Sequence, residues 1–320
     1  MKKDIKIICT LGPKSLNKDF LKFSKNKVNL LRLNMSHLSL MKLKKSIKYI
    51  RKYTKVPICI DTEGAQIRTK VKKEIFLKNG QKIKIKNSKG DFYLYPGAIY
   101  KKIKKKDVLN IGFKNLKLKV IKKNNFILCK VISPGMLENN KGVHLENRKI
   151  KLNYLTEKDF SAIKIGKQLN IKNFALSFTN SVDDIIKFNQ LLKRENKIFK
   201  IETLSAVKNF NSILKKGNNF LIDRGDLSKD IKLENIPIVQ RKLFKLKKKY
   251  TSRKIYVATN LLESMLENKY PTRGEANDIF NTLEMGSGGM VLAAETAIGK
   301  NPMEAVLFLK KIINVYNKNA

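Results

Sequence analysis

The sequence predicts an α/β protein built on a (β/α)8 barrel of the TIM type, with a small antiparallel β domain inserted in it. Two observations predict this fold. Eight short, nearly continuous apolar segments alternate with stretches of helical periodicity, and one long interval after the third segment lacks helical spacing. Near-continuous apolar segments are typical of strands buried on both faces of a parallel sheet. Eight strand–helix repeats fit the roughly 250 residues that such a barrel usually takes.

The predicted elements alternate regularly along the chain. The eight barrel strands are expected at residues 5–10, 28–33, 57–61, 173–177, 197–202, 219–223, 254–259 and 288–293. Helices are expected between or after them, for example at residues 38–53, 156–168, 181–195, 203–215 and 302–316.

The interval after the third strand has a different pattern. Segments such as 81–86 and 116–120 alternate apolar and charged residues, and glycines and turn residues separate them. Such alternation belongs to strands with one face in water. We therefore expect a barrel formed by residues 1–65 and 149–320, and an inserted β domain formed by residues 66–148.

Composition restricts the class of protein. A chain of 320 residues that is 42% hydrophobic can bury a large core and is too apolar to be disordered. No segment approaches the ~18 consecutive apolar residues of a membrane helix. Cys9, Cys59 and Cys129 stand alone within apolar segments, without metal-type spacing. These features predict a cytoplasmic protein with buried thiols and no membrane partner.

The formal charge of +43 raises the question of a nucleic-acid partner. The 69 basic residues are 60 Lys and only 9 Arg, and they are spread through nearly every segment. Proteins that read nucleic acids favour Arg, whose planar group grips phosphates and guanine edges. We interpret the charge as the mark of an AT-rich genome. It predicts only weak, non-specific, salt-sensitive binding to RNA.

Polar side chains gather where the predicted barrel strands end. In this fold active sites form at the carboxyl ends of the strands, and random strand ends would seldom collect so many charges. The residues at these ends are Thr10, Arg32, Asn34, Ser36, Asp61, Thr62, Lys200, Glu202, Arg224, Asp226, Thr259, Glu295 and Thr296.

Two neighbouring strand ends carry a metal-type pattern. Lys200 and Glu202 are two residues apart and therefore project to the same side of a strand. Asp226 follows the next strand, beside Gly225, which permits close backbone approach. Two carboxylates with room for water and substrate oxygens suit Mg²⁺.

The end of the second strand adds polar groups of other kinds. Arg32 offers a bidentate group for phosphate. The side-chain oxygens of Asn34 and Ser36, with those of Asp61 and Thr62, are suited to enclose a monovalent cation. His37 has two readings that the sequence leaves open, a loop histidine that orders the backbone or a nucleotide contact.

Taken in order, these motifs resemble the pyruvate kinase family, over about residues 4–310. The segments that carry the resemblance are KIICTLGP (6–13), RLNMSH (32–37), DTEGAQIRT (61–69), KGV (141–143), KIE (200–202), RGDL (224–227), ATNLLESM (258–265), PTRGE (271–275) and ET (295–296). The resemblance implies a glycolytic, Mg²⁺-dependent phosphotransferase that moves phosphate from phosphoenolpyruvate to ADP, giving pyruvate and ATP. It also implies that the inserted domain is the family's small β-barrel lid.

The resemblance implies roles for individual residues. Glu202 and Asp226 would hold Mg²⁺. Catalytic groups would be Lys200, Arg32 and Thr259, and substrate contacts would come from these three with Gly225 and Asp226. Two further sets are implied: Asn34, Ser36, His37, Arg68 and Lys141 for the nucleotide, and Asn34, Ser36, Asp61 and Thr62 for K⁺.

Some positions depart from the family pattern. They are Glu63, Ala65, Gln66, Asn110, Asn180, Ala293 and Ala294. Gln66 bears on K⁺ dependence, and Ala293 lacks a hydroxyl that would assist proton delivery to the enolate. The chain ends at Ala320, so we expect the family's C-terminal regulatory domain to be absent. Self-association through the barrel is expected to be possible without it.

Three alternatives remain at this stage. One is a catalytically impaired pyruvate kinase homologue that folds and binds but turns over poorly. Another is a basic RNA-binding protein on a retired enzyme fold. The third is a Mg²⁺-dependent aldolase or lyase acting on phosphoenolpyruvate or pyruvate, which the inserted domain and the Arg32 loop disfavour.

Overall fold

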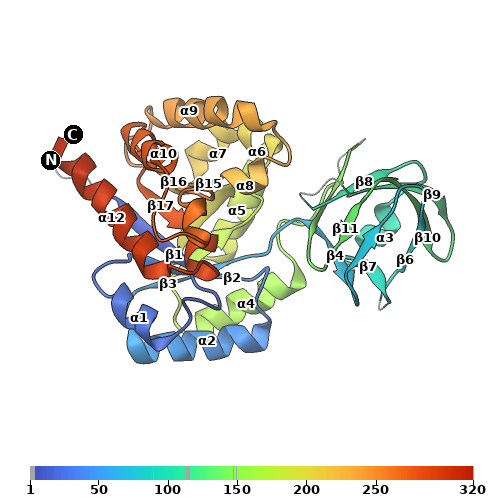
Figure 1. The fold of residues 1–320 in the computed structure, drawn as a ribbon, viewed down its shortest axis with the longest axis horizontal. Coiled ribbons are helices and arrows are strands. Elements are labelled where there is room, and N and C mark those ends of the chain that lie inside the picture. The colour runs from blue at the N-terminus through green and yellow to red at the C-terminus, as the bar shows by residue number, and fades with distance from the viewer. Residues whose placement is uncertain (1–3, 89, 113–115, 147, 149, 320) are drawn as a thin grey trace. The chain divides into compact units, whose positions relative to one another are not determined.

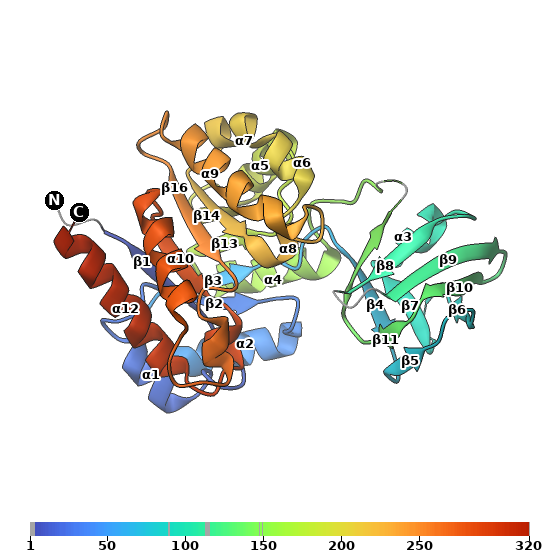
Figure 2. The ribbon, with the colours of Figure 1, turned by 45° about the horizontal axis from the view of Figure 1, so that its top comes forward.

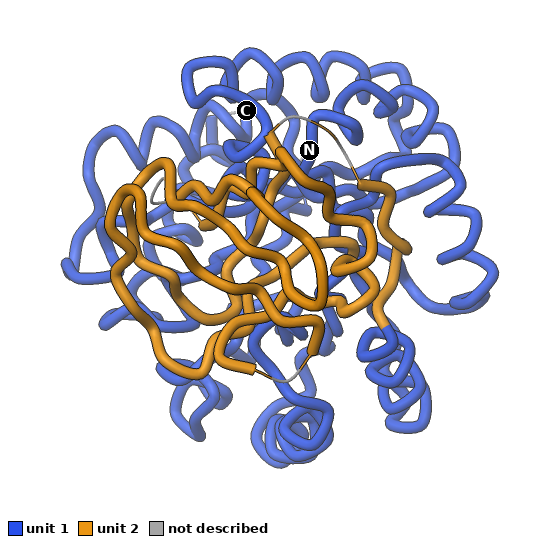
Figure 3. Tube along the Cα trace, turned by 90° about the vertical axis from the view of Figure 1, so that its right-hand side faces the viewer, with its two compact units in different colours: residues 1–64, 157–320 blue, residues 65–156 orange. Residues whose placement is uncertain are grey.

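The computed structural model describes residues 4–319 apart from 89, 113–115, 147 and 149. It divides into two compact units, residues 1–64 with 157–320, and residues 65–156, which are coloured separately in Figure 3. From the sequence, the inserted domain was expected to end at residue 148 and the barrel to resume at residue 149. The shift to 156/157 has a packing reason, because Ile150 and Leu152 pack against the core of the inserted unit.

The first unit is a closed barrel of eight parallel strands surrounded by helices (Figures 1 and 2). This confirms the predicted fold class. The strands follow one another around the barrel in the order β1, β17, β16, β15, β14, β13, β3 and β2. Their bounds are β1 Lys6–Thr10, β2 Leu30–Asn34, β3 Ile58–Asp61, β13 Asn173–Leu176, β14 Asn196–Ile201, β15 Asn219–Asp223, β16 Lys254–Ala258 and β17 Gly289–Leu292.

Side chains from every barrel strand fill one apolar cluster, because alternate residues of each strand point inward. Its members are Leu30, Ile8, Cys59, Ala175, Ile198, Leu221, Tyr256, Ala258 and Val291. Parallel registers such as Lys200 with Leu221 and Asn34 with Asp61 align the strands, so their carboxyl ends meet at one end of the barrel.

The helices of the barrel unit bury one face against the strands. Their bounds are α1 Lys18–Ser24, α2 Leu40–Tyr53, α4 Glu157–Gln168, α5 Val182–Leu191, α6 Leu204–Lys208, α7 Phe210–Lys216, α8 Arg224–Leu227, α9 Ile236–Lys247, α10 Arg273–Glu284, α11 Ala294–Ala297 and α12 Pro302–Asn319, with 3-10 turns at Leu233–Asn235 and Glu263–Leu266. The single helix expected at 203–215 is wrong, because Asn209 leaves helical geometry between α6 and α7 and donates its side-chain amide to the Asn180 carbonyl.

The second unit is mainly antiparallel and has its own core. Seven strands pair in the order β6, β10, β9, β8, β12, β4 and β7, and β11 pairs with β5. Their bounds are β4 Ile67–Val71, β5 Ile75–Leu77, β6 Lys82–Ile85, β7 Phe92–Tyr95, β8 Val108–Ile111, β9 Leu116–Lys123, β10 Ile127–Ser133, β11 Gly135–Leu137 and β12 Gly142–Leu145. The helix α3, Ile99–Lys102, follows β7. A bridge between Lys86, the residue after β6, and Tyr93, within β7, brings the two edge strands together.

The three cysteines are buried and unpaired, as expected. Burial raises the pKa of each thiol, to about 12 at Cys129. None of the helices in the described part of the chain has the length and apolar character needed to cross a bilayer.

Replacing Gly64 with alanine is expected to destabilise the barrel unit strongly. Gly64 has a φ of +67°, and an added Cβ would lie 2.7 Å from the Ser177 carbonyl oxygen. Left-handed strain and overpacking together should lower the free energy of unfolding by about 3 kcal/mol.

Gly286 is the matched control, because its φ is +94° but no atom lies within 4 Å of an added Cβ. Gly286→Ala should cost only about 1 kcal/mol. Urea unfolding of both variants checks this, and equal losses would contradict the clash at Ser177.

Candidate active site

A buried ion pair lies at the carboxyl end of β14. Lys200 is 3% exposed and Glu202, directly after the strand, is 1% exposed. Lys200 Nζ lies 2.7 Å from Glu202 Oε1. The two side chains therefore project to the same side, as the spacing predicted.

Lys200 also faces groups from three other strand ends, those of β3, β13 and β15. Its Nζ lies 3.4 Å from Asp61 Oδ2, 3.3 Å from Ser177 Oγ and 3.5 Å from Asp223 Oδ2. Burial by itself lowers the pKa of a lysine, but the surrounding carboxylates outweigh it and raise the pKa of Lys200. The ammonium is therefore a fixed positive charge at the end of the barrel.

Three carboxylates form the acidic part of this site. One oxygen from each of Glu202, Asp223 and Asp226 lies within 4.8 Å of the others. Asp223 ends β15 and accepts the Asp226 amide as the N-cap of α8, which places both acids on one tight turn. Clustered carboxylate oxygens are the ligands that Mg²⁺ takes in proteins, so the donor set fits a divalent cation.

A backbone amide holds the second carboxylate oxygen of Glu202, the one that does not face Lys200. The Phe178 amide donates to Glu202 Oε2 at 2.6 Å, and Phe178 has a φ of +53°, unusual for a bulky residue. Burial raises the pKa of Glu202, Lys200 opposes that rise, and the nearby Asp226 and Asp223 add to it. Such a carboxylate is stabilised in its charged form by an added cation.

Arg32, on β2, is anchored at the same end of the barrel. Its Nε lies 2.7 Å from Asp61 Oδ2, and its Nη1 donates to Thr10 Oγ1 at 2.9 Å. Burial acts to lower the pKa of Arg32, but Asp61, Asp223 and Glu202 together outweigh it and raise the pKa. The guanidinium is thus charged and fixed in direction.

Thr259, after β16, joins the acidic turn to the next strand end. Its Oγ1 accepts the Gly225 amide at 2.7 Å and lies 3.3 Å from Asp223 Oδ1. Its φ is +70°. Arg224 ties the loops together by donating to the Thr259 carbonyl at 2.7 Å and pairing with Asp278 at 2.6 Å, which is a positioning role for this arginine.

The four residues predicted for K⁺ lie on the adjacent ends of β2 and β3. Side-chain oxygens of three of them, Asn34, Asp61 and Thr62, have partners in the structure. Asn34 Oδ1 accepts the Ser36 amide at 3.0 Å, and Thr62 Oγ1 accepts the Ser177 amide at 3.0 Å. Asp61 contacts both Arg32 and Lys200. Enclosure of a monovalent cation by these groups stays a prediction.

The predicted nucleotide contacts fall in both units. His37 is exposed after β2, and its backbone amide donates to the Asn34 carbonyl at 3.1 Å. This bond does not involve the imidazole, so both readings of the side chain stay predictions. Arg68 and Lys141 lie together in the inserted unit, where Arg68 pairs in register with Gly142 next to Lys141. Lys141 Nζ lies 3.1 Å from Glu138 Oε1.

Sequence reasoning missed three residues of this region: Ser177, Asp223 and Lys229. Ser177 and Asp223 were counted as the closing residues of their predicted strands, and Lys229 was one lysine among sixty. The available signal was position, since Ser177 directly follows β13 and Asp223 ends β15, the two strands that flank β14.

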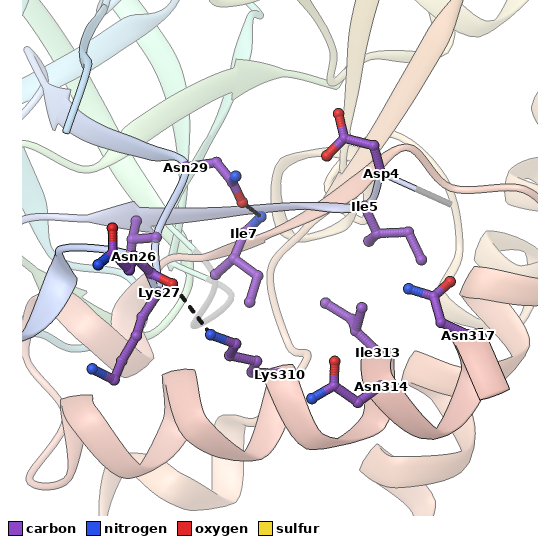
Figure 4. Close-up of a pocket in the computed structure, with 11 residues that line it drawn as sticks. Asp4, Ile5, Ile7, Asn26, Lys27, Asn29, Lys310, Ile313, Asn314 and Asn317 are labelled. Carbon is purple, nitrogen blue, oxygen red and sulfur yellow. Dashed lines mark hydrogen bonds between the residues drawn. The ribbon is translucent and has the colours of Figure 1, made fainter. Parts of the chain in front are cut away.

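A cavity of about 420 Å³ lies elsewhere in the barrel unit, between the start of β1, residues 26–29 and α12 (Figure 4). Across it Lys310 Nζ donates to the Asn26 carbonyl at 3.2 Å, and the Ile7 amide donates to Asn29 Oδ1 at 2.7 Å. Because it adjoins the amino end of β1, it lies at the opposite end of that strand from Thr10 and the charged cluster.

The fold and the cluster together define a class of protein: a (β/α)8 barrel with a β unit inserted after its third strand and a cation-type site at its strand ends. Comparison with known proteins narrows the class. The chain belongs to the pyruvate kinase family, since the family model described as "Pyruvate kinase, barrel domain" matches residues 2–306.

Individual relatives agree with this. The pyruvate kinase of Thermotoga maritima is 33% identical over 325 residues, which cover 96% of this chain and 70% of the relative. That of Geobacillus stearothermophilus is 33% identical over 333 residues, covering 98% and 57%. That of Thermococcus litoralis is 31% identical over 326 residues, covering 96% and 68%. The chain therefore spans between 57% and 70% of the length of these relatives.

Proposed function

We propose that this protein is a Mg²⁺-dependent pyruvate kinase, which transfers phosphate from phosphoenolpyruvate to ADP to give pyruvate and ATP in glycolysis. The observation that carries the proposal is the meeting of Lys200, Glu202 and Asp226 at the carboxyl end of a closed barrel. Family membership supplies the reaction that such a site would serve.

The charges suit phosphoryl transfer, which depends on positioning and on cations that stabilise the charge of the transferring group. Lys200 is a buried ammonium, and its fixed position avoids a reorganisation cost during reaction. Arg32 offers a planar group for phosphate oxygens. Glu202 and Asp226 would hold Mg²⁺, which would neutralise charge on substrate oxygens.

The carboxylate end of the substrate is assigned to Gly225 and Thr259. The Gly225 amide donates to Thr259 Oγ1 in the structure, so a substrate carboxylate would exchange with this contact. Ala293 offers no hydroxyl for proton delivery to the enolate, and its amide donates to Glu295 Oε2 at 2.7 Å. Restoring Ser at this position should leave turnover equal or faster.

The remaining assignments extend the same proposal. Asn34, Ser36, His37, Arg68 and Lys141 are proposed for the nucleotide, and Asn34, Ser36, Asp61 and Thr62 for K⁺. The free, buried thiols support a cytoplasmic location. Self-association through the barrel remains part of the proposal.

A coupled assay for pyruvate formation tests the function. Purified protein should form pyruvate only when phosphoenolpyruvate, ADP and Mg²⁺ are all present. Parallel reactions with and without K⁺ decide whether the monovalent site is used. Absence of Mg²⁺-dependent turnover from folded protein at saturating substrates would refute the proposal and favour an impaired homologue with a binding role, RNA being the candidate partner.

A further inference from the structure

Two charged residues beside the proposed cation site have no part in the function proposed above. They are Asp223, at the end of β15, and Lys229, just after α8. The inference drawn from them rests on the proposed divalent-cation site and concerns how this chain sets its affinity for the metal.

Asp223 is positioned as a ligand. It is 6% exposed, and its place at the end of a buried strand fixes its backbone. Oδ1 accepts the Asp226 amide at 3.4 Å, and Oδ2 lies 3.5 Å from Lys200 Nζ. One of its oxygens also lies within 4.8 Å of oxygens from Glu202 and Asp226. Small side-chain movements would bring all three onto one cation.

One buried oxygen of Glu202 has acceptor capacity beyond its ion pair with Lys200. Glu202 is 1% exposed, and its Oε1 accepts no geometrically sound hydrogen bond within the described part of the chain, although it lies 2.7 Å from Lys200 Nζ. A buried carboxylate oxygen in that state is stabilised by a further positive charge.

Lys229 already supplies a positive charge to another carboxylate of the cluster, that of Asp226. Its Nζ forms an ion pair with Asp226 Oδ1, and the Lys229 side chain is 12% exposed against 25% for Asp226. The pair is partly shielded from water, so the attraction is stronger than in an exposed pair. A divalent ion that binds Asp226 through this oxygen must take the place of the ammonium.

The formal charges of the cluster show why one divalent cation can replace the Lys229 ammonium. Arg32 pairs with Asp61, and Lys200 lies closest to Glu202. Asp223 and Asp226 then remain as two negative charges, which Lys229 neutralises only in part. If the ammonium withdraws, the two charges equal those of one divalent cation.

We propose that Asp223 is a third carboxylate ligand of the divalent cation, and that Lys229 is the resident counter-charge that the cation displaces from Asp226. In the substrate-free protein, two residues then change the metal affinity in opposite directions. Asp223 strengthens binding and Lys229 weakens it.

Direct binding of Mn²⁺ to substrate-free protein, followed by electron paramagnetic resonance, tests this without an activity readout. Asp223→Asn should raise the Kd for Mn²⁺ by about tenfold, since ligand charge tunes such sites. Lys229→Met should lower the Kd by about tenfold, because it removes the competing ammonium. The double variant should lie near the wild type.

Lys187→Met is the matched control. Lys187 forms an exposed i,i+4 ion pair with Asp183 at 2.7 Å on α5, so its loss removes the same charge from a salt bridge without touching the cluster. Its Kd should equal that of the wild type. Thermal unfolding checks that each variant is folded, and Lys229→Met tests the proposal on its own if Asp223→Asn does not fold.

The outcomes separate this inference from the proposed function. If Glu202→Gln abolishes Mn²⁺ binding while Asp223→Asn and Lys229→Met leave it unchanged, the cation site stands and the roles given to Asp223 and Lys229 are wrong. If Glu202→Gln has no effect on Mn²⁺ binding, the proposed site itself is wrong.

Discussion

Replacing Lys200 with methionine is expected to lower turnover by about 10³-fold while changing the KM for phosphoenolpyruvate much less. The ammonium is 3% exposed and surrounded by Asp61, Glu202 and Asp223. Its charge is therefore fixed in advance for the transition state, where charge on the transferring phosphoryl group develops. Steady-state kinetics of pyruvate formation measure the two parameters separately.

The control for this variant is Lys197→Met, on the same strand. Lys197 lies three residues before Lys200. Its Nζ donates to the Leu192 carbonyl at 2.6 Å and takes no part in the charged cluster. Its turnover should stay within about twofold of the wild type, the range expected for a site remote from chemistry. A rise in KM without loss of turnover at Lys200→Met would refute the transition-state role.

Glu202→Gln and Asp226→Asn are each expected to weaken divalent-cation binding by about 100-fold and to lower activity in parallel. Both changes keep side-chain shape and remove one negative charge from a cluster whose oxygens lie within 4.8 Å. Titration of Mn²⁺ binding, and of activity against Mg²⁺ concentration, checks the two effects together.

Asp183→Asn removes the same charge from an exposed helix position and serves as the reference for these variants, since its carboxylate is paired at the surface of α5. It should leave Mg²⁺ dependence unchanged. If Glu202→Gln or Asp226→Asn behaved like Asp183→Asn, the assignment of the metal ligands would be wrong.

The barrel could be predicted from sequence because burial on both faces imposes continuous apolar segments on parallel strands. The segment predicted at 219–223 coincides with β15, and that at 254–259 differs from β16 by one residue. Helices were harder to predict. α1, α9 and α10 lie outside the helical segments named from the sequence. At Asn209, where α6 and α7 are separate, the side chain contacts the distant Asn180, which periodicity does not reveal.

The charged cluster could be predicted in part. Lys200 and Glu202 follow from two-residue spacing on one strand, and Asp226 from its place on the next strand end. Asp223 could not be recognised as a fourth member, because it closes an apolar segment and only the register between β14 and β15 brings it to Lys200. The pairing of Lys229 with Asp226 depends on the short turn of α8, and nothing in a lysine-rich sequence marks that lysine.

The central claim is that one divalent cation binds where the side chains of β14 and α8 meet. Anomalous diffraction from crystals soaked in Mn²⁺ tests it most directly. A single strong peak at about 2.2 Å from carboxylate oxygens of both Glu202 and Asp226 is the predicted result. A peak bound to neither residue, in crystals where the cluster is accessible to solvent, would contradict it.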